Sequence, residues 1–255
     1  MLASRKTPWL RVLKSDPDAK VRLFCFSYAG AGANAYRAWA DAPFEGVELA
    51  AVQLPGRETR MREEPFASVA PLVAALGREL APYLYGKPFV FFGHSMGALL
   101  GFELTRALRR QGKPMPRALF VSGRRGPDTT PEPDDCLRHL LSDDDLIDEV
   151  RGMNGTADGV MQDRELLALL LLIFRADFSV CENWRHLHER PLDVPIHALG
   201  GADDPGVSRA HLEAWSRQTG GTYTLDMFEG GHFYINDARE QLLARVDTYL
   251  RQYAT

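Results

Sequence analysis

Ser95 lies between Gly93 and Gly97 in the stretch GHSMG, which fits the pattern G-x-S-x-G. The apolar run before it (88–94) is typical of a strand, and the segment after it (98–112) has helical spacing. A serine on such a strand-to-helix turn projects its hydroxyl at a helix N-terminus, where negative charge is favoured. The glycines remove side chains that would collide in so tight a turn. The pattern predicts a nucleophile, although a match of three fixed positions also arises by chance.

A serine nucleophile needs a base, and His232 has the position that suits this role. It follows the last expected strand (222–231), where a loop can turn its ring toward the carboxyl edge of a parallel sheet. His94 is too close to Ser95 along the chain to deprotonate it. The remaining histidines lie in charged surroundings, in a strand-like run or at a helix start: His139, His186, His188, His197 and His211. We therefore expect His232 to be the general base.

The base in turn needs an orienting carboxylate, and GGADDPGVS supplies Asp203 and Asp204 directly after a strand. The chain order Ser, Asp, His is that of the α/β-hydrolase arrangement. Pro205 would shape the turn that fixes Asp204. We therefore favour Asp204 as the orienting carboxylate. Asp203 is the alternative, and we expect it instead to be solvated or to cap the loop.

An oxyanion needs N–H donors, and two backbone groups are candidates. One is the N–H of Met96, the residue after the serine. The other is the N–H of Ala29, in the small-residue loop FSYAGAGANAY (26–36) after an early strand. The alternative for this loop is a plain Gly/Ala turn.

These residues lie at the ends of strand-like runs that alternate with amphipathic helical runs, which predicts an α/β fold with a mostly parallel central sheet and flanking helices. Strands are expected at 21–28, 47–56, 88–94, 118–124, 194–201 and 222–231. Helices are expected at 68–84, 98–112, 211–220 and 236–253, with Asn236 or Asp237 capping the last.

Residues 126–190 interrupt this alternation with Pro- and Asp-rich turns and two helix-like runs, and they contain no strand-like run. We interpret them as a helical lid inserted in a single domain that spans residues 1–255. Within the lid, LLALLLLIF (166–174) offers more apolar surface than one helix face needs.

The composition is that of an ordinary soluble globule, with 45% hydrophobic and 25% charged residues. Thirty basic against 34 acidic side chains create no global field that would favour nucleic acid or membrane partners. The start of the chain lacks the apolar core of a signal peptide, and the longest apolar run is too short to span a bilayer. Three scattered cysteines indicate a reducing compartment, and we find no metal-site motif. We expect a cytoplasmic monomer with no bound metal.

Four motifs together resemble the type II thioesterases, the editing enzymes of polyketide and non-ribosomal peptide synthesis. They are GHSMG (93–97), SYAGAGANAY (27–36), LPGRETRMREEP (54–65) and GGHFYIND (230–237). The early loop of the family commonly reads Phe-Pro-His-Ala-Gly-Gly, from which Ser27, Tyr28 and Ala31 depart here. The oxyanion role survives these departures, because a backbone N–H does not depend on side-chain identity. The resemblance covers essentially the whole chain and implies an α/β-hydrolase fold with a lid.

The resemblance also implies an activity, the hydrolysis of acyl thioesters on the phosphopantetheine arm of an acyl or peptidyl carrier protein. In that reaction Ser95 would attack the carbonyl, His232 would take the proton, Asp204 would orient the histidine, and the N–H groups of Ala29 and Met96 would hold the oxyanion. No cofactor is implied, since the substrate itself carries phosphopantetheine. The 166–174 run would either line an acyl chamber or pack on the body.

Carrier proteins are usually acidic, so a basic rim should help docking. The candidates, which could equally be ordinary surface residues, are Arg57, Arg60, Arg62, Arg124 and Arg125; Arg57 could instead pin its own loop. The competing functions are a carboxylesterase or lipase with the same triad, an acyltransferase, and a catalytically inactive binding protein of the same fold.

Overall fold

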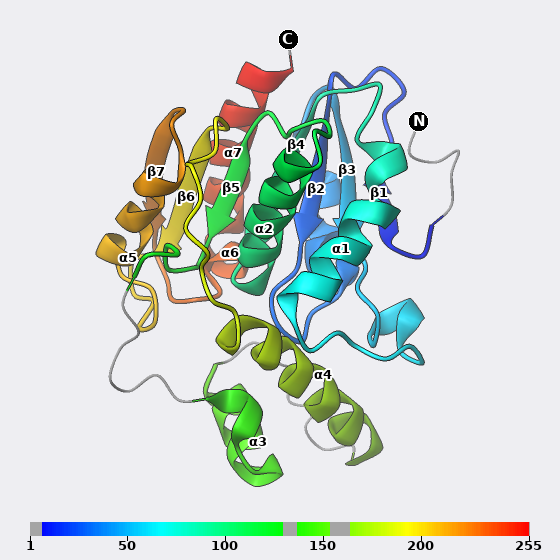
Figure 1. Cartoon of the computed structure of the whole chain (residues 1–255), viewed down its shortest axis with the longest axis vertical. Coiled ribbons are helices and arrows are strands. Elements are labelled where there is room, and N and C mark those ends of the chain that lie inside the picture. Colours follow the sequence, from blue (N-terminus) through cyan, green and yellow to red (C-terminus); the bar gives the residue numbers. More distant parts are fainter. Residues whose placement is uncertain (1–6, 130–136, 154–163, 255) are drawn as a thin grey trace.

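A twisted sheet of seven strands forms the centre of the molecule (Figure 1). The computed structural model describes residues 7–129, 137–153 and 164–254. In spatial order the strands are β1 (Leu10–Lys14), β3 (Val47–Val52), β2 (Val21–Phe26), β4 (Phe89–His94), β5 (Leu119–Ser122), β6 (Ile196–Gly201) and β7 (Tyr223–Phe228). β1 pairs antiparallel with β3, and the other neighbouring pairs are parallel.

The central strands are mostly apolar because both faces of the sheet are covered, and the buried charges of Arg22 in β2 and Glu48 in β3 are paired with each other at 2.6 Å. Every residue of β2, β3, β4, β5 and β6 is buried. A parallel sheet that is buried on both faces reads as continuous hydrophobic runs rather than alternating ones. The edge strands β1 and β7 are only partly buried.

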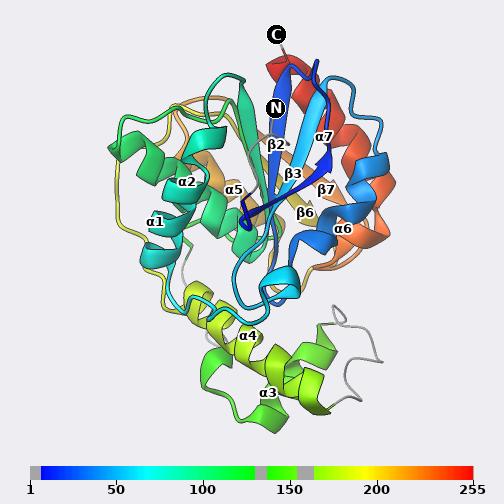
Figure 2. The ribbon, with the colours of Figure 1, turned by 90° about the vertical axis from the view of Figure 1, so that its right-hand side faces the viewer.

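Helices form a layer on each face of the sheet (Figure 2). One layer contains α1 (Val69–Glu79), α2 (Met96–Arg110) and α5 (Arg209–Glu213), and its residues share one large hydrophobic cluster with the sheet. The other layer contains α6 (Tyr234–Asp237), α7 (Arg239–Tyr253) and a 3-10 helix (Ala33–Asp41), which share a second cluster. The two layers leave the carboxyl ends of the parallel strands uncovered by the body.

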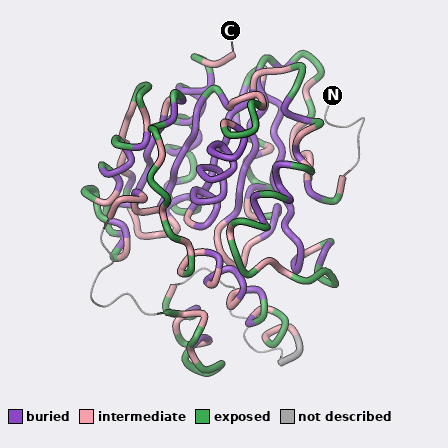
Figure 3. Tube along the Cα trace, viewed as in Figure 1, coloured by how far each residue is buried: buried purple, intermediate pink, exposed green. Residues whose placement is uncertain are grey.

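Two further helices, α3 (Asp143–Gly152) and α4 (Arg164–Glu182), lie beyond these carboxyl ends, at the bottom of Figures 1 and 2. They share a small cluster of four buried residues, Leu146, Val150, Leu171 and Phe178. Figure 3 shows most of their trace as half-buried or exposed. Leu169 and Leu172 in the apolar run of α4 are 42% and 62% exposed. The body of the protein therefore does not bury this run completely.

The α/β architecture and the two helices within residues 126–190 confirm the predictions from sequence, and the described part of that segment contains no strand. The single-domain interpretation of residues 1–255 stays a prediction. No helix in the described ranges is both long and apolar enough to cross a membrane. Cys25 and Cys181 are free thiols, whereas Cys136 lies outside the described residues.

Several expected boundaries were wrong, with identifiable causes. The helix expected over 68–84 ends at Glu79 and is followed by a 3-10 turn (Ala81–Tyr83), since Pro82 lacks an N–H and restricts the residue before it. The helix expected over 211–220 is α5 followed by a 3-10 helix (Ala214–Gln218).

The predicted cap of the last helix was also wrong. Asn236 and Asp237 lie inside α6, and α7 begins after Ala238 without a side-chain cap. The elements that were not predicted include the edge strand β1 and the 3-10 helix Ala33–Asp41.

Candidate active site

Ser95 occupies a strained turn between β4 and α2. Its backbone angles are φ 53° and ψ −114°, a region that residues with a side chain rarely adopt. Among the described non-glycine residues, only Ser95 and Glu58 have positive φ. The N–H of Ser95 donates to the carbonyl oxygen of Ser122 at 2.8 Å, which ties the turn to the end of β5. Strained backbone of this kind costs about 1–3 kcal/mol and persists where the surroundings enforce it.

The two glycines of GHSMG allow backbone segments to approach closely. A Cβ on Gly93 would lie 2.1 Å from the carbonyl oxygen of Gly97. A Cβ on Gly97 would lie 2.0 Å from the carbonyl oxygen of Phe26, at the end of the neighbouring strand β2. These approaches confirm the expectation that side chains would collide in this turn.

The structure brings His232 and Asp204 together. His232 follows β7 and Asp204 follows β6, and the His232 Nδ1 lies 2.7 Å from the Asp204 Oδ2. The other carboxylate oxygen accepts the N–H groups of Gly206 at 2.9 Å and Val207 at 3.2 Å. The Asp204 side chain is 2% exposed, whereas that of His232 is 29% exposed. The carboxylate is therefore fixed by its own turn, while the histidine ring is accessible.

Asp203, the alternative orienting carboxylate, points elsewhere. Its Oδ2 accepts the N–H of Gly230 at 3.3 Å, and its own N–H donates to the carbonyl oxygen of Gly230 at 3.0 Å. Asp203 thus joins the loop after β6 to the loop after β7. It helps to hold the two loops that carry Asp204 and His232.

His94 is a buried neighbour of this pair that sequence reasoning considered only as a base. Its Nδ1 lies 2.8 Å from the Ser122 hydroxyl, which also bonds the Tyr234 hydroxyl. Its ring centroid lies 5.0 Å from that of His232. Burial, followed by the proximity of His232, holds the pKa of His94 well below its ordinary value. His94 is therefore neutral beside the candidate base.

The candidate oxyanion donors lie where the sequence predicted them. Met96 is the first residue of α2, and Ala29 follows β2. Within the described part of the chain, neither N–H donates to a protein acceptor. Two residues of this loop that differ from the common family sequence have partners within the protein. The Ser27 hydroxyl donates to the Gly32 carbonyl at 2.7 Å, and the Tyr28 ring packs edge-on against His94.

A buried ion pair joins the segment after β3 to the lid, and the same carboxylate also bonds the candidate oxyanion loop. The Arg57 Nη1 and Nη2 lie 2.6 and 2.9 Å from the two carboxylate oxygens of Asp177 in α4. The Asp177 Oδ2 also accepts the N–H of Gly30 at 2.8 Å. Gly30 has φ 79°, and a Cβ there would lie 2.2 Å from the ring of Phe174 in α4. Sequence reasoning named Arg57 but had no signal for its partner in the lid.

The arginines expected to form a docking rim have different environments. Arg57 and Arg60 are buried, and Arg60 is paired with Glu63. Neither guanidinium is therefore available to the surface of an acidic carrier protein. Arg125 donates through Nε to the Gly206 carbonyl at 2.8 Å, which supports the turn of Asp204. Arg62 is exposed and Arg124 is half-buried. The alternative in which Arg57 pins its own loop agrees with these contacts.

Comparisons with known proteins agree with this geometry. Residues 21–250 match the thioesterase domain family. The gramicidin S biosynthesis protein GrsT of Aneurinibacillus migulanus is 39% identical over 248 residues, which cover 97% of this chain and 96% of that protein. Thioesterase PikA5 of Streptomyces venezuelae is 34% identical over 95% of this chain and 85% of its own.

A solved structure is similar over nearly the whole chain. It is that of the type II thioesterase BorB from the borrelidin biosynthetic cluster, with 36% identity and a TM-score of 0.85 over 98% of this chain and 99% of that one. The chain therefore belongs to the thioesterase domain family, and it is a type II thioesterase of the α/β-hydrolase fold.

Proposed function

We propose that this enzyme removes acyl groups from the phosphopantetheine arm of a carrier protein that serves polyketide or non-ribosomal peptide synthesis, through an acyl-Ser95 intermediate. The observation that supports the proposal is the distance of 2.7 Å between the His232 Nδ1 and the Asp204 Oδ2, together with the position of Ser95 directly after β4, a parallel strand of the same sheet as β6 and β7. The relatives named for gramicidin S and borrelidin biosynthesis support the carrier-bound substrate.

The pairing of His232 with Asp204 sets the direction of proton transfer. An ionised carboxylate only accepts hydrogen bonds, so the His232 Nδ1 carries a proton and its Nε2 is left as the base. Burial and the proximity of His232 hold the pKa of His94 well below its ordinary value, so His94 adds no second positive charge beside the imidazolium of His232. Asp204 stabilises the imidazolium that results.

The reaction follows from these roles. The Ser95 hydroxyl oxygen attacks the thioester carbonyl as its proton moves to the His232 Nε2, and the N–H groups of Ala29 and Met96 stabilise the oxyanion. The carbon–sulfur bond breaks, and the leaving pantetheine sulfur takes the proton from His232. Water, deprotonated by His232, then cleaves the acyl-Ser95 ester and restores the serine. Each proton and electron pair is carried by these residues, the substrate or water, so these steps need no cofactor.

The lid and the basic side chains would shape access. Phe174 of α4 lies against Gly30 in the candidate oxyanion loop, so the lid contacts the loop that carries Ala29. Of the expected docking residues, Arg62 and Arg124 are the two that remain for an acidic carrier surface. The proposal includes a cytoplasmic monomer that meets its carrier in solution.

The decisive experiment is the hydrolysis of an acyl-loaded carrier protein, followed by mass spectrometry, with the wild type and with Ser95→Ala. We expect the wild type alone to remove the acyl group. If neither acts on the carrier while the wild type cleaves simple oxygen esters, the enzyme is an esterase instead.

A matched pair of variants tests the orienting carboxylate. Asp204→Asn is expected to lower kcat by about 10⁴, as loss of this group does in serine hydrolases with the same triad. Asp203→Asn, whose side chain bonds only the neighbouring loop, should retain most of the activity. Equal losses in the two variants would contradict the assignment of Asp204.

A further inference from the structure

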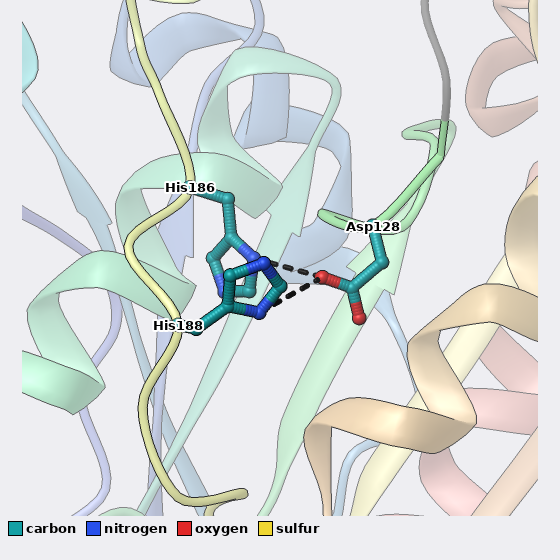
Figure 4. A group of neighbouring side chains, drawn as sticks. All are labelled: Asp128, His186 and His188. Atoms are coloured by element: carbon teal, nitrogen blue, oxygen red, sulfur yellow. Dashed lines mark ion pairs between the residues drawn. The ribbon is translucent and has the colours of Figure 1, made fainter.

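We propose that Asp128, His186 and His188 form a binding site for a divalent transition-metal ion of the zinc type, which joins the two segments that connect the lid to the body. Asp128 lies in the segment that runs from β5 into the lid, and the histidines lie in the segment that returns from α4 to β6 (Figure 4). Neither the activity nor the proposed function involves these residues.

The distances between the three side chains suit a single ion. The Asp128 Oδ1 lies 2.9 Å from the His186 Nδ1 and 3.9 Å from the His188 Nδ1. One ligand atom from each residue lies within 4.8 Å of the other two. Ligands bound tetrahedrally to zinc at about 2.1 Å are separated by about 3.4 Å. Small rotations of the side chains would therefore give three ligands to one ion.

Two of the ligand atoms are buried without a partner. The Asp128 Oδ1 and the His186 Nδ1 have no hydrogen-bond partner among the described residues, although the two atoms lie 2.9 Å apart. The His186 side chain is only 9% exposed. A buried polar atom left unpaired is destabilising, and an ion between these atoms would satisfy both.

The surroundings orient the ligands. The second oxygen of Asp128 accepts the side-chain amide of Gln218 at 2.6 Å, and Gln218 is itself buried. This contact turns Oδ1 toward the histidines, as outer contacts do for carboxylate ligands in metal sites. The rings of Phe102 and Trp184 lie near the His186 ring at centroid distances of 6.2 and 5.8 Å and restrict its rotation.

A simple imidazolium–carboxylate pair is the competing explanation for this cluster. A direct pair would satisfy both atoms with one hydrogen bond, whereas the Asp128 Oδ1 and the His186 Nδ1 are each without a hydrogen-bond partner among the described residues. The charged groups around the ring are Asp128 and Arg106, with His188 beside it; Arg106 is itself paired with Glu103. An ion bound between the two unpaired atoms accounts for their positions better than a direct pair does.

The donor set selects the kind of ion. Two imidazoles and one carboxylate suit zinc and its neighbours, whereas calcium and magnesium require mostly oxygen ligands. The Nε of Arg217 lies 3.5 Å from the Asp128 Oδ2. The positive charge of this guanidinium disfavours an ion that is bound by electrostatic attraction alone. The His188 side chain is 88% exposed, which leaves a position open to water.

The test is a titration of tag-free, chelator-treated full-length protein with Co²⁺, whose visible absorption reports nitrogen coordination, followed by displacement with Zn²⁺. We expect one ion per chain. His188→Ala and Asp128→Asn should weaken binding at least tenfold. His188 is exposed, so its variant should fold normally. His211→Gln removes a histidine outside the cluster and serves as the matched control.

Equal affinity in His188→Ala, Asp128→Asn and the wild type would overturn the proposal, as would binding only at millimolar concentration. A second measurement is the thermal unfolding of the wild type and His188→Ala with and without Zn²⁺. A zinc-induced rise in Tm that is lost in His188→Ala supports the site, and an equal rise in both proteins contradicts it.

Discussion

Replacing Asp177 by asparagine would leave the Arg57 guanidinium buried without a counter-charge. The two side chains are 4% and 2% exposed and are joined by two short hydrogen bonds. Removing one partner of a buried ion pair costs about 3–5 kcal/mol. Asparagine keeps the shape and one acceptor oxygen, so we expect the lower value of about 3 kcal/mol. In a chain of this size each kcal/mol shifts Tm by about 2–4 °C, which gives a fall of about 6–12 °C.

The same substitution should also slow the reaction. Asp177 accepts the N–H of Gly30, the residue after the proposed oxyanion donor Ala29. A loosened donor loop is expected to lower kcat on an acyl-pantetheine thioester by about ten- to a hundredfold, measured well below Tm. Asp148→Asn is the matched control in the same lid. Its partner Arg151 is 55% exposed, so less than about 1 kcal/mol should be lost.

A double variant separates charge from shape. Arg57→Met with Asp177→Leu removes both charges, so most of the lost stability should return. The kcat should stay low, since Gly30 still lacks its acceptor. An unchanged Tm in Asp177→Asn, or a double variant as unstable as the single one, would refute the reasoning.

Two further predictions concern stability. Gly97→Ala should lower the free energy of unfolding by more than about 3 kcal/mol in urea titrations, because its Cβ would meet the Phe26 carbonyl. Gly112→Ala should cost only about 1–2 kcal/mol, because a Cβ there meets open space and only the φ of 60° is unfavourable. Burial lowers the pKa of His197 to about 4, so between pH 6.5 and 4 the unfolded chain binds a proton that the folded one does not. The free energy of unfolding should be insensitive to this group above pH 6.5 and should fall by about 1.4 kcal/mol per pH unit between pH 6.5 and about pH 4. Urea titrations over this pH range should find a smaller slope in His197→Gln.

The sequence sufficed to predict the parts of the site that depend on local pattern and topology. Ser95 was predicted from its glycines and stays a candidate, and the contact of Asp204 with His232 follows from the rule that carboxyl ends of parallel strands share one edge. The preference for Asp204 over Asp203 agrees with the hydrogen bond to His232.

Contacts between distant segments left no such signal. Arg57 and Asp177 are separated by 120 positions, and nothing in the local pattern of either residue indicates the other. The same holds for Asp128 and His186, which lie at opposite ends of the lid, so the sequence predicted no metal site. β1 was not predicted because its five half-buried residues form neither a continuous apolar run nor a regular alternation of apolar and polar residues.

The lid has a hydrophobic cluster of its own, and this separation has a consequence for how the enzyme can evolve. Of the residues in or packed against that cluster, Ala29 is the one that belongs to the body. Substitutions at Leu171 or Phe178 can therefore alter the packing of the lid while the two larger clusters keep theirs. We therefore expect the four buried residues of the lid cluster to tolerate substitution with little effect on the packing of the body.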